Sequence, residues 1–133
     1  MQKSDKKHIL LIDDDQQLRE VISMALDGAG YDCSEAQDGK EGMDILMAGQ
    51  PVDLIVTDHQ MPRMTGLELV KWVRAHSSFS RTPVLLYSGQ LDSHLSQQAH
   101  EAGSTAVLAK PFLLPDLLIL VTQLMALSRN SLS

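Results

Sequence analysis

The fold of this chain follows from residues 53–66, which read Asp53-Leu54-Ile55-Val56-Thr57-Asp58-His59-Gln60-Met61-Pro62-Arg63-Met64-Thr65-Gly66. The stretch begins as a short apolar run rich in β-branched residues, which is typical of a strand buried on both faces. The run ends on one carboxylate, Asp58, and a turn containing Pro62 and Gly66 follows. An acid at the carboxyl end of a central parallel strand lies where open α/β sheets bind ligands, so Asp58 is a candidate functional residue.

Outward from this stretch, strands and helices alternate along the whole chain. Apolar runs predict strands at 9–12, 31–36, 53–58, 83–87 and 106–109. Helical spacing predicts helices at 16–29, 40–48 and 66–74, a fourth that begins after Asp92 or Ser93 and ends at Ala102, and a fifth at 114–127. Asp15 and Thr65 are candidate N-caps. Such alternation predicts an α/β fold: a doubly wound, flavodoxin-like, five-stranded parallel sheet of order 2-1-3-4-5 with helices on both faces.

Length and composition narrow the class of protein. A chain of 133 residues with 44% hydrophobic and 21% charged residues fits one soluble globular domain, predicted at 8–127 with short flexible tails at 1–7 and 128–133. The net charge of −6 disfavours direct binding of nucleic acid. The longest apolar stretch, 113–127, is interrupted by polar residues and by Pro115, so no membrane span is expected. A single cysteine, Cys33, excludes an intramolecular disulfide and favours a reducing, cytoplasmic compartment.

Polar residues lie at the ends of four predicted strands and converge at one edge of the predicted sheet. They are Asp13 and Asp14, Asp58, Ser88 and Lys110. Three carboxylates in one cleft repel one another, and a hard divalent cation such as Mg²⁺ offsets this repulsion. With a cation bound, a carboxylate can act as a nucleophile toward a phosphoryl group. Lys110 supplies a compact positive charge for a phosphate oxygen, and Ser88 supplies a hydroxyl.

With these pieces in order, the chain resembles the response-regulator receiver domains of two-component signalling, which share the fold of chemotaxis protein Y. The matching segments are 11–15, 57–66, 87–89 and 110–112, and the resemblance covers about residues 8–127. It implies that Asp58 accepts a phosphoryl group from a sensor histidine kinase or a phosphotransfer protein. It also implies that Asp14 binds Mg²⁺ directly, Asp13 through a water molecule, and Gln60 through its backbone carbonyl. Such domains are mostly bacterial and catalyse only their own phosphorylation and dephosphorylation.

The resemblance also implies a switch. Ser88 would be the switch hydroxyl, Lys110 would pair with the phosphoryl group, and the peptide bond to Pro111 would be cis. Two positions depart from the family pattern: Val107 stands where an aromatic residue is common, and Gly89 where alanine is usual. We therefore expect the state of the site to be relayed through loop and helix movement more than through rotation of a ring.

The last predicted helix carries more apolar residues than one buried face requires, namely Leu113, Ile119, Leu120 and Leu127. In the resembled family, the face formed by the fourth helix, fifth strand and fifth helix commonly mediates dimerisation or output. We therefore favour a homodimer or a partner-docking role over simple packing. No output domain follows, so the chain is either a stand-alone receiver or a fragment of a longer regulator.

Two other functions compete with signalling. A haloacid-dehalogenase-like phosphatase also forms an aspartyl phosphate on a doubly wound fold, but Gln16-Gln17 after Asp13-Asp14-Asp15 does not fit its signature. A structural pseudo-receiver would carry no phosphate. The intact acidic pair, together with Asp58 and Lys110, argues against that alternative.

Overall fold

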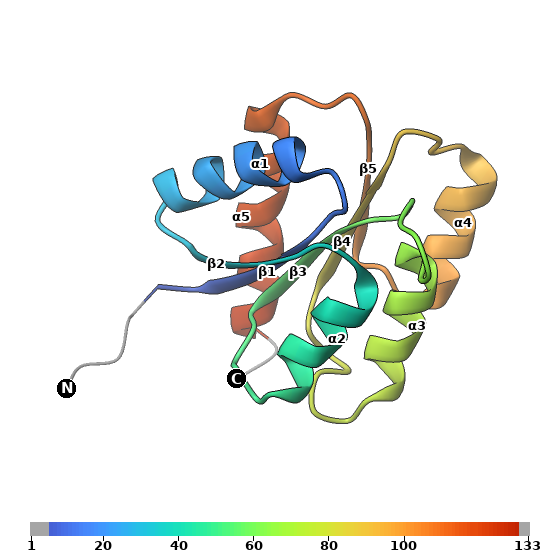
Figure 1. Ribbon diagram of the computed structural model, residues 1–133, viewed down its shortest axis with the longest axis horizontal. Helices are drawn as coiled ribbons and strands as arrows, with labels where there is room; N and C mark the ends of the chain where they lie inside the picture. Colours follow the sequence, from blue (N-terminus) through green and yellow to red (C-terminus); the bar gives the residue numbers. More distant parts are fainter. Residues whose placement is uncertain (1–5, 131–133) are drawn as a thin grey trace.

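Five parallel strands form a single sheet in the order β2-β1-β3-β4-β5, which confirms the predicted topology (Figure 1). The structure, a computed structural model, describes residues 6–130, with side chains described as far as Leu127. The strands are β1 (His8–Ile12), β2 (Asp32–Ala36), β3 (Leu54–Asp58), β4 (Val84–Ser88) and β5 (Ala106–Ala109). β3 and β4 are buried along their whole length, as their continuous apolar runs predict.

Helices cover both faces of the sheet. They are α1 (Gln16–Gly28), α2 (Gly39–Met47), α3 (Gly66–Ala75), α4 (Ser93–Ala102) and α5 (Leu114–Asn130). Figure 1 shows α1 and α5 on one face and α2, α3 and α4 on the other. Each layer has its own apolar core, because alternate side chains of the strands point to opposite faces.

Side-chain caps fix where most helices begin. Asp15 accepts a hydrogen bond from the Leu18 amide, and Thr65 forms a reciprocal capping box with Glu68, as predicted. For α4, the cap is Asp92, so Ser93 is the first helical residue. α2 differs from prediction: it begins one residue early, at Gly39, because Asp38 caps it through the Glu41 amide.

The last helix is longer than predicted. α5 continues to Asn130, three residues past the predicted end at Leu127, which shortens the predicted tail at 128–133. Residues 1–5 and 131–133 of the predicted tails lie outside the described residues. Leu113, Ile119 and Leu127 are 69%, 57% and 49% exposed, as expected, but Leu120 packs partly against the α1/α5 core. Among the helices described, none combines the length and apolarity needed to cross a membrane.

Arg74, near the end of α3, forms hydrogen bonds through one guanidinium group to the end of α4, the loop before β4 and the residue before β5. Its Nε donates to the carbonyl of Gly103, the residue that ends α4, at 2.9 Å. Its Nη1 donates to the carbonyls of Ser80 and Thr82 in the loop before β4, and its Nη2 to Thr105 Oγ1. Carbonyls at a helix end attract a cation, so this arrangement anchors the carboxyl end of α4.

Candidate functional site

Three acids meet at the carboxyl edge of the sheet, as the sequence predicts. Asp13 follows β1, Asp14 comes next in the chain, and Asp58 is the last residue of β3. One carboxylate oxygen from each lies within 4.8 Å of the others, the only such group among residues 6–130. Asp13 and Asp58 are 0% and 3% exposed, whereas Asp14 is exposed. We call this group of two buried acids and one exposed acid the acidic pocket.

The carboxylate of Asp13 is held by hydrogen bonds on both oxygens. Oδ1 accepts from the Asp15 amide at 2.8 Å, and Oδ2 accepts from the hydroxyl of Tyr87 at 2.5 Å. Arg19 Nη1 donates to the backbone carbonyl of the same residue at 2.6 Å. Burial raises the pKa of Asp13, and the hydrogen bond from Tyr87 opposes that rise.

Asp58 has weaker partners. Lys110 Nζ lies 3.4 Å from its Oδ2, and the Gln60 amide lies 3.4 Å from its Oδ1. Burial raises the pKa of Asp58, the negative charge of Asp13 raises it further, and Lys110 opposes both effects. The Asp58 carboxylate is therefore buried beside a cation and another acid, and its hydrogen bonds are longer than those of Asp13.

Ser88 and Lys110 lie on the other side of Asp58, at the ends of β4 and beyond β5. The backbone amide of Lys110 donates to the Ser88 carbonyl at 2.9 Å, which joins these two segments. Ser88 is buried, and its Oγ accepts from the Gln90 amide at 3.1 Å. The Lys110–Pro111 peptide bond is cis, as predicted. A Cβ at Gly89 would meet only the side chain of Gln60, at 3.8 Å, so packing does not require glycine there.

The donor set fits a hard divalent cation. Carboxylate oxygens are the ligands that Mg²⁺ prefers, and three of them converge here without enough positive charge to neutralise them. Asp13, Asp14 and Asp58 could hold such an ion. Gln60 lies two residues after Asp58 in the β3–α3 loop, and its backbone N–H donates to the Asp58 carboxylate.

Sequence reasoning missed two residues of this site, Tyr87 and Arg19. The sequence places Tyr87 in a predicted strand and in the matching segment 87–89, and Arg19 in a predicted helix, without a role for either side chain. One signal was available: a tyrosine in a strand buried on both faces needs a partner for its hydroxyl, and the nearest predicted polar groups were those of the site.

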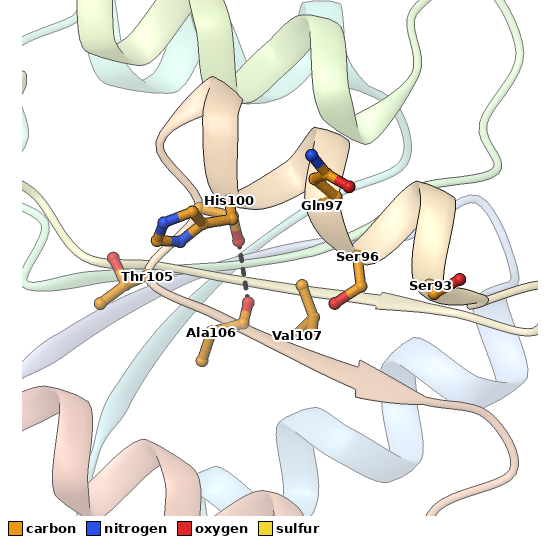
Figure 2. Close-up of a pocket in the computed structure, with 8 residues that line it drawn as sticks. Ser93, Ser96, Gln97, His100, Thr105, Ala106 and Val107 are labelled. Carbon is orange, nitrogen blue, oxygen red and sulfur yellow. Dashed lines mark hydrogen bonds between the residues drawn. The ribbon is translucent and has the colours of Figure 1, made fainter.

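A separate cavity of about 460 Å³ lies between α4 and β5 (Figure 2). None of the three acids lines it. Val107 forms part of its wall, where an aromatic side chain would occupy more of the space. The lining residues are Ser93, Ser96, Gln97, His100, Ser104, Thr105, Ala106 and Val107.

Comparison with known proteins identifies relatives along nearly the whole chain. The family model described as response regulator receiver domain matches residues 9–122. A chemotaxis protein CheY homolog of Campylobacter jejuni is 34% identical over 105 residues, which cover 78% of this chain and 81% of the relative. The response regulator MprA of Mycolicibacterium vanbaalenii is 36% identical over 110 residues, covering 83% of this chain but only 46% of the relative.

Solved structures agree with these matches. The structure of the chemotaxis response regulator CheY4 of Vibrio cholerae superposes with a TM-score of 0.84 at 33% identity, covering 90% of this chain and 98% of that one. A "putative response regulator" from Chloroflexus aurantiacus superposes with a TM-score of 0.86 at 31% identity, covering 92% of this chain and 99% of that one.

Proposed function

This chain belongs to the response regulator receiver domains, which are signalling domains, and we propose that Asp58 is its phosphoacceptor. One observation carries the proposal: the buried carboxylate of Asp58 lies at a strand end, 3.4 Å from Lys110 Nζ and beside two further acids. The phosphoryl donor would be a sensor histidine kinase or a phosphotransfer protein. A cytoplasmic location is part of the proposal, supported by the lone cysteine, Cys33, which packs partly against the core as a free thiol.

The proposed reaction uses groups already in place. An oxygen of Asp58 forms a bond to phosphorus while the phosphorus–nitrogen bond of the donor phosphohistidine breaks, and the leaving imidazole nitrogen takes a proton from solvent. Lys110 lies where it can pair with a phosphoryl oxygen, and the Ser88 hydroxyl is at the end of the adjacent strand. Phosphoryl transfer requires mainly positioning and charge neutralisation, which these residues supply.

The proposal includes a Mg²⁺ ion held by Asp13, Asp14, Asp58 and the backbone carbonyl of Gln60. When bound, such an ion neutralises charge on the carboxylates and on the transferred phosphoryl oxygens. The contribution of the chain is to keep the acids together despite their mutual repulsion. Asp13 is fixed by its hydrogen bonds, and Asp14 is exposed.

We propose that phosphorylation changes the surface formed by α4, β5 and α5, and that this surface binds an output partner or a second copy of the chain. Two features support this. Leu113, Ile119 and Leu127 expose large apolar side chains before and along α5. The cavity beside Val107 lies between α4 and β5, so it leaves room for α4 to move without rotation of an aromatic ring.

Intact-mass spectrometry after incubation with acetyl phosphate and Mg²⁺ tests the phosphoacceptor. We expect a single phosphoryl adduct on the wild type, and none with Asp58→Asn or in excess chelator. Asp38→Asn is the matched control, because Asp38 is equally buried near the same edge of the sheet and should leave the adduct intact. An adduct that persists in Asp58→Asn would reject the assignment, as would the absence of an adduct on the folded wild type.

A further inference from the structure

We propose that Tyr87 is a positioning residue of the acidic pocket, whose hydroxyl holds the carboxylate of Asp13 in the orientation needed to bind a divalent cation. The inference rests on the proposed function and extends it, since it assigns the cation affinity of the pocket partly to a residue that is not itself a ligand. Two observations support it: the position of Tyr87 in the sheet and its contacts with Asp13 and Lys110.

The register of the sheet sends the Tyr87 side chain toward Asp13. Tyr87 and Leu85 point into the core beneath α1 and α5, while Leu86 points to the opposite face. Tyr87 is 0% exposed, and it is paired in register with Asp58 on β3. Its hydroxyl therefore reaches across β3 to Asp13, the residue that follows β1.

The contact with Asp13 restricts the carboxylate to one orientation. The Asp15 amide holds Oδ1 from the side of α1, and the Tyr87 hydroxyl holds Oδ2 from the side of β4. A carboxylate with a donor on each oxygen cannot rotate without breaking a hydrogen bond, and a buried broken bond is costly. Groups that hydrogen-bond to metal ligands in this way raise metal affinity by fixing the ligand geometry.

Tyr87 acts only as a donor. Burial raises the pKa of its phenol far above neutrality, and the negative charge of Asp13 raises that pKa further. The hydroxyl therefore keeps its proton at neutral pH and donates it to Oδ2 of Asp13.

The same ring supports the opposite side of the pocket. Lys110 Nζ lies 5.3 Å from the ring centroid, within the range of a cation–π interaction, and Phe112 packs edge-on at 5.4 Å. Tyr87 therefore touches both Asp13 and Lys110, the residues on either side of Asp58. A buried tyrosine whose hydroxyl merely needed a partner would give the same hydrogen bond, but it would not control cation binding, and this difference can be measured.

The test is Tyr87→Phe, which removes the hydroxyl and keeps the ring against Lys110 and Phe112. Calorimetric titration with Mg²⁺, without any phosphodonor, should show a dissociation constant about 10-fold to 100-fold higher than that of the wild type. With acetyl phosphate, the Mg²⁺ concentration for half-maximal adduct formation should rise by a similar factor, while the rate at saturating Mg²⁺ changes little. The control is Tyr31→Phe, because Tyr31 is the only other tyrosine and lies at the far end of the same core.

The outcomes separate this inference from the proposed function. If the wild type binds Mg²⁺ and forms the adduct, but Tyr87→Phe has unchanged Mg²⁺ affinity, the positioning role is rejected and the phosphoacceptor assignment stands. If the wild type neither binds Mg²⁺ nor forms an adduct, both are rejected. If Tyr87→Phe does not fold, the NMR signal of the Tyr87 hydroxyl proton in the wild type decides: a shift on Mg²⁺ saturation supports the role, and an unmoved signal overturns it.

Discussion

Asp58 and Asp38 are two buried carboxylates near the same edge of the sheet, and their pKa values are shifted in opposite directions. They are 3% and 4% exposed. Asp38 caps α2 through a 2.8 Å hydrogen bond from the Glu41 amide and also pairs with Arg63, and these contacts lower its pKa. Asp58 has only two partners at 3.4 Å, and burial raises its pKa. Burial alone therefore does not mark a functional acid, whereas a raised pKa next to other acids points to one, as at Asp58 and Asp13.

The largest effect on stability should come from removing the carboxylate of Asp38. Asp38→Ala loses both the helix cap and the ion pair, so we expect the free energy of unfolding to fall by about 2 kcal/mol at pH 7. Asp92→Ala is the control, since it removes a cap of the same kind from an exposed residue and should cost about 1 kcal/mol. Urea denaturation measures both, and equal losses would show that the burial of Asp38 adds nothing.

Removing the charge of Asp58 should change the free energy of unfolding in the opposite direction. Asp58→Asn eliminates a buried charge beside Asp13, so we expect the free energy of unfolding at pH 7 to rise by on the order of 1 kcal/mol. Asp92→Asn should change it little, because asparagine is also a good cap. A loss of stability in Asp58→Asn would mean that pairing with Lys110 outweighs burial.

The pH dependence of the Asp58→Asn effect follows from the raised pKa. As pH falls from neutrality through the folded-state pKa of Asp58, the carboxylate of the folded wild type takes up a proton, and the cost of burying its charge disappears. The higher free energy of unfolding of Asp58→Asn should therefore vanish by about pH 4. Asp38 has a lowered pKa, so its contribution should persist to about pH 4 and be lost only below that. Urea denaturation at a series of pH values from 7 downward would test whether the effect of Asp58→Asn is lost at higher pH than the contribution of Asp38.

The smallest effect should come from the cation partner of Asp38. The Arg63 side chain is 68% exposed, so Arg63→Gln should lower the free energy of unfolding by about 0.5 kcal/mol or less, and the loss should shrink in high salt. A loss comparable to that of Asp38→Ala would show that the ion pair, and not the cap, is what satisfies Asp38.

The sequence predicts those parts of the site that depend on strand ends. Asp13, Asp58, Ser88 and Lys110 each follow or end an apolar run, and the parallel order of the sheet brings such ends together. The roles of Asp38 and Tyr87 depend on other information. Asp38-Gly39 has the composition of a turn, and a helix that starts on glycine gives no local signal. The partner of Tyr87 lies 74 residues earlier in the chain, and only the packed sheet defines that contact.

The anchoring of α4 by Arg74 has a mechanical consequence. The carboxyl end of this helix is bound through Gly103 to α3, while its amino end follows the exposed Gly89 and Gln90, directly after Ser88. If the proposed phosphorylation displaces Ser88, we expect α4 to tilt about a pivot at Gly103, because Arg74 holds that end of the helix. The surface of α4 would then move most near Asp92 and least near Gly103, which would give the movement of the proposed output face a direction.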